Sequence, residues 1–258
     1  MATALPLSCA ADGERVGVRS YCGLIQPSDP LRMREKGEVF PSHPRGERHG
    51  VRGNPKSRMS ELVLATRNPK KVEELKALLA DLPLRILSLR DFPEVPETPE
   101  TGVTFAENAE LKARAAALAT GKPALADDSG LEVDALGGKP GIYSNRFAGP
   151  GATDRDRYMR VLELLEGVPE DKRTARFRAA AAVARPDGDT VVVEGTCEGR
   201  IALEPRGEHG FGYDPIFYLP ELGKTMAELP PEEKNRISHR GKAMQAAKNV
   251  LRELFGTG

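Results

Sequence analysis

The sequence is poor in cysteine, has no net charge and contains no long apolar run. Its three cysteines, Cys9, Cys22 and Cys197, are too few and too scattered for a disulfide framework or a cysteine-based zinc site. The 38 Lys and Arg residues balance 38 Asp and Glu residues, whereas a protein built to bind duplex DNA needs a basic surplus for its phosphate contacts. No segment approaches the roughly 20 apolar residues of a membrane-spanning helix. These absences predict a globular, cytoplasmic protein that binds neither nucleic acid nor membrane.

The first 58 residues differ in composition from the rest of the chain. They hold ten Lys or Arg against six Asp or Glu, together with six prolines and seven glycines. No helical or strand periodicity is sustained there, so the segment cannot bury enough apolar surface to offset its ordering entropy. It also lacks the features of a signal peptide. We predict that residues 1–58 are a disordered extension or the product of an upstream start, and that residues 59–258 form the domain. A targeting or docking role for the extension is the alternative.

From residue 59 onward, strand and helix patterns alternate. The apolar run at 61–65 predicts a strand, and Asn68 followed by Pro69 predicts a helix start, because Asn caps helices and Pro suits the first turn. Further strands are predicted over 84–89, 123–126, 176–185, 190–194 and 200–203, and further helices over 104–120, 153–165 and 240–255. A capping box is expected at 104–107. The pattern predicts an α/β domain with a mixed β-sheet flanked by helices.

Residues 66–71, with the sequence TRNPKK, could form a phosphate-binding loop. They join a buried strand to a helix N-terminus, where free backbone N–H groups and the helix dipole attract anions. Lys71 adds a cation one turn into the helix. A plain capped helix with solvent-facing lysines explains the same residues, and the glycines of a Walker loop are missing.

Acidic residues follow the strand predicted at 123–126. Asp127 and Asp128 suit a hard cation such as Mg²⁺, which takes one or two carboxylates together with waters and phosphate oxygens. One of the two carboxylates could also accept a proton from an attacking water. Glu100 offers a further carboxylate, and Lys112 could contact phosphate. The alternatives are an Asp-rich turn and an ordinary solvated lysine.

Two later segments could hold a nucleobase. In residues 210–215, with the sequence GFGYDP, the glycines permit a tight turn and Phe211 could stack on a base. Lys234, His239 and Arg240 form a cluster of donors, which favours a ligand atom that only accepts hydrogen bonds, such as a carbonyl oxygen. A simple hairpin corner and a capped helix start are the alternatives.

Taken in order, seven short motifs resemble the inosine/xanthosine triphosphate pyrophosphatase family. They are residues 64–71, 100–102, 104–108, 126–130, 141–144, 210–215 and 238–241. No single motif is specific, but their joint occurrence and order are, and the resemblance extends from about residue 61 to residue 254. Members of this family hydrolyse non-standard purine nucleoside triphosphates (ITP, dITP, XTP) to the monophosphate and pyrophosphate. The resemblance implies a two-lobed single domain with a central nucleotide cleft, a Mg²⁺ cofactor and a homodimer.

The resemblance also implies residue roles. Asp128 matches the proton acceptor, and Glu100 and Asp128 match the metal ligands, with Asp127 as a supporting ligand. The residues implied to bind substrate, from the phosphate loop to the base pocket, are Thr66, Arg67, Asn68, Pro69, Lys70, Lys71, Lys112, Ser129, Phe211, Gly212, Tyr213, Asp214, Lys234, His239 and Arg240. Donors at the base pocket would pair with the C6 oxygen of hypoxanthine or xanthine and reject the amino group of adenine.

The chain departs from the family pattern at three positions, Arg67, Asn145 and His209. We expect these to affect kinetics rather than the reaction, with Arg67 adding charge near the γ-phosphate. Two rival functions remain: a Maf-like pyrophosphatase of modified pyrimidine triphosphates, and a non-catalytic purine-nucleotide sensor. The base-pocket segments argue against the first. The Asp127–Asp128 pair argues against the second, because a binding protein has little use for a general base.

Overall fold

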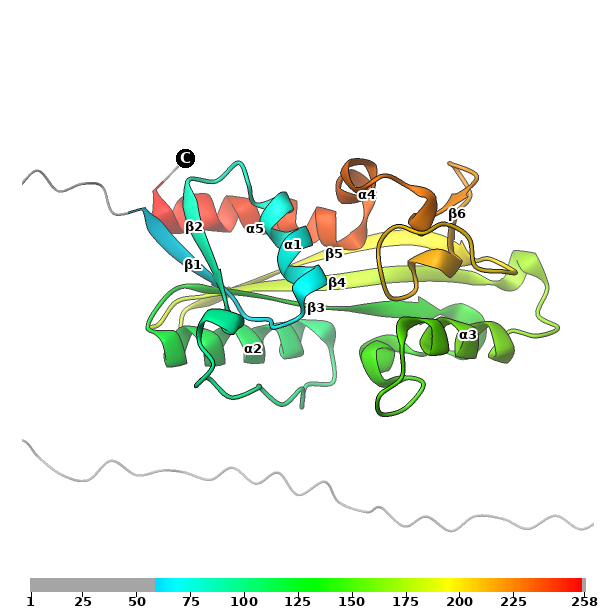
Figure 1. Ribbon diagram of the computed structural model, residues 1–258, viewed down its shortest axis with the longest axis horizontal. Coiled ribbons are helices and arrows are strands. Elements are labelled where there is room, and N and C mark those ends of the chain that lie inside the picture. The colour runs from blue at the N-terminus through cyan, green and yellow to red at the C-terminus, as the bar shows by residue number, and fades with distance from the viewer. Residues whose placement is uncertain (1–58, 257–258) are drawn as a thin grey trace, which may run out of the picture. The chain divides into compact units, whose positions relative to one another are not determined.

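The computed structural model describes residues 59–256, which form a seven-stranded mixed sheet with helices on both faces (Figure 1). The strands, in the spatial order β2-β1-β3-β4-β5-β6-β7, are β1 (Ser60–Leu64), β2 (Leu84–Ser88), β3 (Ala124–Val133), β4 (Thr174–Ala184), β5 (Thr190–Ile201), β6 (Phe217–Leu219) and β7 (Lys224–Thr225). β1 pairs in parallel with β2 and β3, and all the other pairs are antiparallel. The predicted mixed sheet is confirmed, while the prediction for residues 1–58 lies outside the described residues.

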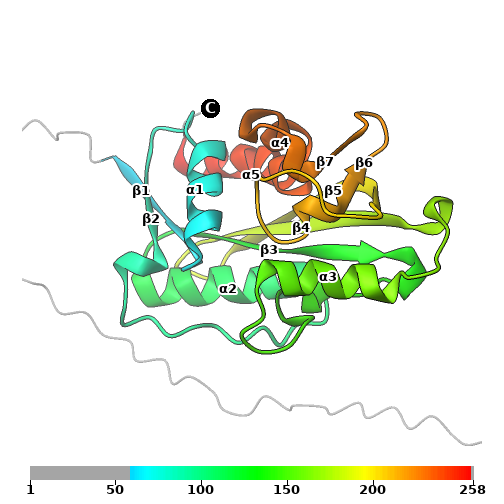
Figure 2. The same ribbon diagram turned by 45° about the vertical axis from the view of Figure 1, so that its right-hand side comes forward.

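Helices cover the sheet on two sides. They are α1 (Pro69–Leu78), α2 (Phe105–Thr120), α3 (Asp154–Leu164), α4 (Pro231–Ile237) and α5 (His239–Phe255). α1 and α5 lie on one face, whereas α2 and α3 follow one another along the opposite face (Figure 2). Within residues 59–256, no helix is both long enough and apolar enough to cross a membrane.

The helix boundaries follow from local side-chain chemistry. The Asn68 side chain accepts hydrogen bonds from the backbone N–H groups of Lys70 and Lys71, which confirms the predicted start of α1. Gly121, at φ 63°, ends α2 in the left-handed conformation that glycine adopts at little cost. The capping box predicted for α2 forms only in part: Thr104 accepts from the Glu107 N–H, but the Glu107 carboxylate accepts from the N–H of Val103.

Two strand predictions are wrong. β3 does not end before the acidic pair but continues through it, with Asp127 opposite Ala181 and Asp128 opposite Ala180 of β4. The strand expected at 200–203 is the end of β5, which stays paired with β4 as far as Arg200. In both cases a long neighbouring strand continues the hydrogen-bond ladder past residues whose own pattern indicates a break, because strand formation depends on cross-strand context.

The buried residues form three clusters that divide the domain into two lobes. In the first lobe, one cluster packs beneath α1 and α5 around Leu62 and Leu64, and a second packs beneath α2 around Val63. The second lobe has its own cluster around Leu131 and Phe217, which includes residues of α3. The predicted two-lobed single domain is confirmed.

The space between the lobes arises where two parallel strands diverge. β1 ends at Leu64, and after the Ala65 N–H has bonded to the Leu125 carbonyl the chain turns away toward α1. β3 continues to Val133, so from Asp127 onward its edge no longer pairs with β1. Ligands of open α/β sheets bind at such a divergence, beyond the carboxyl end of a strand.

Candidate active site

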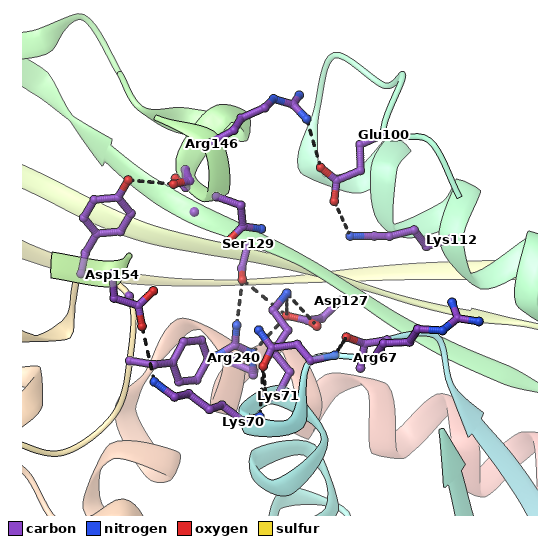
Figure 3. A pocket seen from close by; sticks show the side chains of 18 of the residues that line it. Arg67, Lys70, Lys71, Glu100, Lys112, Asp127, Ser129, Arg146, Asp154 and Arg240 are labelled. Carbon is purple, nitrogen blue, oxygen red and sulfur yellow. Dashed lines mark hydrogen bonds and ion pairs between the residues drawn. The ribbon is translucent and has the colours of Figure 1, made fainter. Parts of the chain in front are cut away.

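A cleft of about 1050 Å³ lies at this divergence and brings together nearly all the predicted site residues (Figure 3). Its lining includes the whole 66–71 segment, together with Glu100, Lys112, Asp127, Ser129, the four residues 211–214, Lys234, His239 and Arg240. Asp128 is the one predicted site residue absent from this lining. The volume is at the upper end of the range for small-molecule sites, which is ample for a nucleotide.

The adjacent acids of β3 have separate partners. Side chains alternate across a strand, so Asp127 and Asp128 project to opposite faces. Both Asp127 oxygens lie 3.2 Å from Lys71 Nζ, and Oδ2 also accepts from Arg240 Nε at 3.0 Å. Burial acts to raise the pKa of Asp127, but the charges of Lys71 and Arg240 outweigh it and hold that pKa well below its usual range. Asp127 is therefore a fixed anion that orders two cations.

Asp128 shares its partner with Glu100. Lys112 Nζ donates to Asp128 Oδ1 at 2.7 Å and to Glu100 Oε1 at 3.2 Å. Burial raises the pKa of Asp128, and the neighbouring Lys112 ammonium offsets part of that effect. Carboxylates from the loop before α2 and from β3 thus converge on one cationic position.

This convergence of two carboxylates fits a divalent cation that takes few ligands from the protein. Mg²⁺ takes one or two carboxylates and completes its shell with waters and phosphate oxygens, and the Lys112 ammonium shows that the two carboxylates face one point of positive charge. Among residues 59–256, no three His, Cys, Asp or Glu side chains gather closely enough to hold a metal by themselves. The Asp127 oxygens instead bind Lys71 and Arg240. Its role as a supporting metal ligand stays a prediction.

The phosphate-loop candidate lines the cleft from 66 to 71. Thr66 Oγ1 accepts from the Asn68 N–H at 3.2 Å, which orders the turn into α1. Lys70 extends to the solvent-exposed mouth and pairs with Asp154 Oδ2 at 3.5 Å. The Arg67 guanidinium instead donates to the backbone carbonyls of Phe92 and Val95, so its charge is not directed at a γ-phosphate position as expected.

At the other end of the cleft, the 210–215 turn is held by buried charges. Asp214 Oδ2 accepts from the Phe211 N–H at 2.9 Å and from Lys234 Nζ at 2.7 Å. Lys234 and Arg240 lie 5.0 and 5.2 Å from the centre of the Phe211 ring. A Cβ on Gly210, whose φ is 77°, would collide with Asp214 Oδ2, so only glycine permits this tight turn. Tyr213 does not present a stacking face: it is buried, and its hydroxyl donates to the Ser144 carbonyl.

His239 is a neutral group at neutral pH. Burial first, and then the charges of Arg240 and Lys234, lower the pKa of His239 well below its usual value. Its ring stacks on Phe177 at 4.5 Å, and its Nδ1 is buried with no hydrogen-bond partner among residues 59–256. A neutral imidazole carries one donor and one acceptor, so His239 can either donate a hydrogen bond to a nucleobase or accept one from it.

Several charged residues of the site carried no sequence signal of their own. Glu74 accepts from Arg240 Nη1 at 2.9 Å and lies 3.6 Å from Lys234 Nζ. Its position three residues after Lys71, on the same face of α1, is the one hint that could have identified it. Arg146 pairs with Glu100 at 3.5 Å, and Asp154 pairs with Lys70, contacts that only the folded chain creates.

These features define an α/β protein whose two lobes enclose a cleft, with an anion-ready helix N-terminus beside a pair of converging carboxylates. Sequence comparison gives the class a name. The profile of the Ham1 family matches residues 62–250, and the chain belongs to that family.

Relatives and solved structures agree with the assignment. The chain is 56% identical over 198 residues to a dITP/XTP pyrophosphatase of Geobacillus kaustophilus, spanning 77% of this chain and 97% of that protein. It is also 56% identical over 186 residues to the dITP/XTP pyrophosphatase of Thermus thermophilus, spanning 72% and 89%. The structure of a HAM1 protein from Coxiella burnetii superposes with a TM-score of 0.69 at 49% identity, covering 76% of this chain and all of that one. The Staphylococcus aureus Ham1 protein gives 0.68 at 42% identity, covering 75% and 99%.

Proposed function

We propose that this protein hydrolyses the non-standard purine nucleoside triphosphates ITP, dITP and XTP to the monophosphate and pyrophosphate, and so clears them from the nucleotide pool. The observation that carries the proposal is the convergence of the Glu100 and Asp128 carboxylates on the Lys112 ammonium. Glu100 and Lys112 line the cleft, and Asp128 contacts Lys112 from β3 without lining the cleft itself. The activity named for relatives at 56% identity supports it.

We further propose that Glu100 and Asp128 hold Mg²⁺. When bound, this cation supplies charge neutralisation for the phosphate oxygens. Asp127 contributes indirectly, because its carboxylate holds the Lys71 and Arg240 side chains at the cleft floor. The homodimer remains a prediction of the family resemblance, and the cytoplasmic location remains a prediction of the composition.

In the proposed reaction, a water adds to the α-phosphorus and Asp128 accepts its proton. The bond between the α-phosphorus and the bridging oxygen breaks, and pyrophosphate leaves with that oxygen. The raised pKa of Asp128 suits this role, since a general base works best with a pKa nearer the operating pH. Lys70, Lys71 and Lys112, all of which line the cleft, stabilise the departing pyrophosphate.

Base selection rests on the other end of the cleft. Phe211 offers a face for stacking, and His239 and Lys234 offer donors for the C6 oxygen of hypoxanthine or xanthine. Arg240 commits one hydrogen bond from each of its three nitrogens to Asp127, Glu74 and Ser129, and so it orders the pocket. Adenine would leave buried donors facing its amino group, a mismatch that can discriminate by about 10⁴-fold.

A panel of triphosphates tests the proposal. With Mg²⁺, the full-length protein should release pyrophosphate from ITP, dITP and XTP far faster than from ATP. Equal rates on ATP would contradict the proposed specificity. Preference for UTP or dTTP would favour the Maf-like alternative, and tight binding of ITP without pyrophosphate release would favour the sensor.

A further inference from the structure

The cations that line the cleft differ in how firmly they are held. Lys71, Lys234 and Arg240 are buried, and each donates to a carboxylate at hydrogen-bond distance. Lys112 is shared between two carboxylates, and its side chain is 14% exposed. Lys71, Lys234 and Arg240 are therefore fixed parts of the cleft floor and have little freedom to follow a ligand.

Lys70 and Arg146 stand apart from this group. Their side chains are 60% and 49% exposed, and each makes an ion pair at 3.5 Å, which is longer than a normal charge-assisted hydrogen bond. Arg146 additionally lies over the Tyr143 ring, 5.0 Å from its centre. An exposed ion pair of this length contributes little to stability, so its partners exchange readily.

Both of these long ion pairs join the two lobes, with the cation on the first lobe in one pair and on the second lobe in the other. Lys70, in the first turn of α1, reaches Asp154, the first residue of α3. Arg146, the last residue of the 3₁₀ helix η3 (Gly141–Arg146), reaches Glu100, in the loop that precedes α2. Figure 3 shows Arg146 and Lys70 on opposite sides of the pocket, each directed at a carboxylate from another segment.

We propose that Arg146 is a further substrate-binding residue, which clamps the polyphosphate tail together with Lys70. This inference rests on the proposed function and names a residue that the family motifs do not. A polyphosphate presents several anionic oxygens, and the planar guanidinium can donate to two of them at once. In the clamp, phosphate oxygens take the place of the Glu100 and Asp154 carboxylates as partners of the two cations. The exchange leaves Glu100 free of Arg146 and bridges the lobes through the ligand.

Calorimetric titration with two product probes tests the clamp on the full-length chain. Arg146→Gln should weaken the binding of inorganic pyrophosphate by about tenfold, the effect of losing a charge-assisted contact, and change IMP binding less than about twofold. Arg146→Lys keeps the positive charge but loses the planar guanidinium. Its affinity for pyrophosphate should lie between those of the wild type and Arg146→Gln. Arg155→Gln, at an exposed position of α3 outside the cleft lining, should match the wild type. Thermal melting of each variant verifies that it is folded.

Removal of the carboxylate that competes for Lys70 should change the pyrophosphate affinity in the opposite direction. Asp154→Asn frees Lys70 from its partner and should tighten pyrophosphate binding. Unchanged pyrophosphate affinity in Arg146→Gln, or an equal loss for pyrophosphate and IMP, would overturn the clamp while leaving ITP hydrolysis intact. A wild-type protein that binds pyrophosphate through Arg146 but fails to hydrolyse ITP would overturn the proposed function instead.

Discussion

Asp127 and Asp128 are adjacent in β3 but differ in their partners and in the direction of their pKa shifts, because side chains alternate between the two faces of a strand. Asp127 meets Lys71 and Arg240, and the pKa of its carboxyl is lowered by these charges despite burial. Among residues 59–256, Lys112 is the one hydrogen-bond partner of the Asp128 side chain, and burial raises the pKa of Asp128. The first is thereby a permanent counter-ion, and the second is the candidate proton acceptor.

Asp128→Asn tests this division at the level of one atom. The amide oxygen can still accept from Lys112, so the fold should persist, while the proton acceptor is lost. We expect kcat for ITP to fall at least about 10²-fold, with a melting temperature close to that of the wild type. Asp187→Asn, in the hairpin turn between β4 and β5, is the matched control. A variant that keeps wild-type turnover would remove Asp128 from its proposed role.

His239 should make stability depend on pH. Its pKa is lowered in the folded state by burial and by nearby cations, so the unfolded chain binds the proton first. The associated stability is present above the unfolded value of about 6.5 and is lost as the pH falls toward the folded value. Denaturant titrations from pH 7 to pH 5 should show a loss of up to about 1.4 kcal/mol per pH unit.

His239→Gln should flatten this part of the profile, and His209→Gln, at an exposed position, should leave it unchanged. If the profile of the His239 variant superposes on that of the wild type, the stability change has another source.

At the level of elements, the boundaries of helices and strands could be predicted from the sequence where local interactions determine them. Asn68 and Pro69 determine the start of α1, Thr153 with Asp156 closes a capping box on α3, and the 186–189 turn joins β4 to β5. Reasoning failed at the extent of β3 and β5, whose later residues are held in strand by β4 rather than by their own pattern.

The site shows the same division between local and long-range causes. The motif residues could be identified from sequence because they are contiguous and resemble a family. Glu74, Arg146 and Asp154 could not, because their roles depend on partners 46 or more residues away that only the folded chain brings near. Likewise, no local pattern indicates that Arg67 donates hydrogen bonds to the backbone carbonyls of Phe92 and Val95.

The close contact between β3 and η3 can be tested by adding one methyl group with Gly130→Ala. A Cβ on Gly130 would lie 2.5 Å from the Gly141 carbonyl oxygen and from Ser144 Oγ, atoms that cannot both move aside. Gly130→Ala should therefore lower the free energy of unfolding by about 1–3 kcal/mol, as overpacking does. Urea denaturation measures the change, and Asp187→Asn, at an exposed position of the turn between β4 and β5, is the control. Equal stability of both variants would contradict the close packing.

At the level of the whole molecule, function depends on where the sheet divides. The parallel end of the sheet supplies the loop at 66–71 and α1, whereas the long antiparallel strands support the second lobe. Because β3 belongs to both lobes, its residues 127–129 lie between them and connect the two halves of the site. Glu100, in the loop before α2, and Arg146, at the end of η3, line the same cleft as Asp127 and Ser129.

The most direct measurement follows Mn²⁺, a hard divalent cation that substitutes for Mg²⁺ at carboxylate oxygens, by paramagnetic resonance in the presence of an α,β-methylene analogue of ITP. The wild-type protein and Asp187→Asn should bind Mn²⁺ alike, while Glu100→Gln and Asp128→Asn should each bind it at least about tenfold more weakly. Wild-type Mn²⁺ affinity in both of these variants would contradict the proposal that the two carboxylates share a cation.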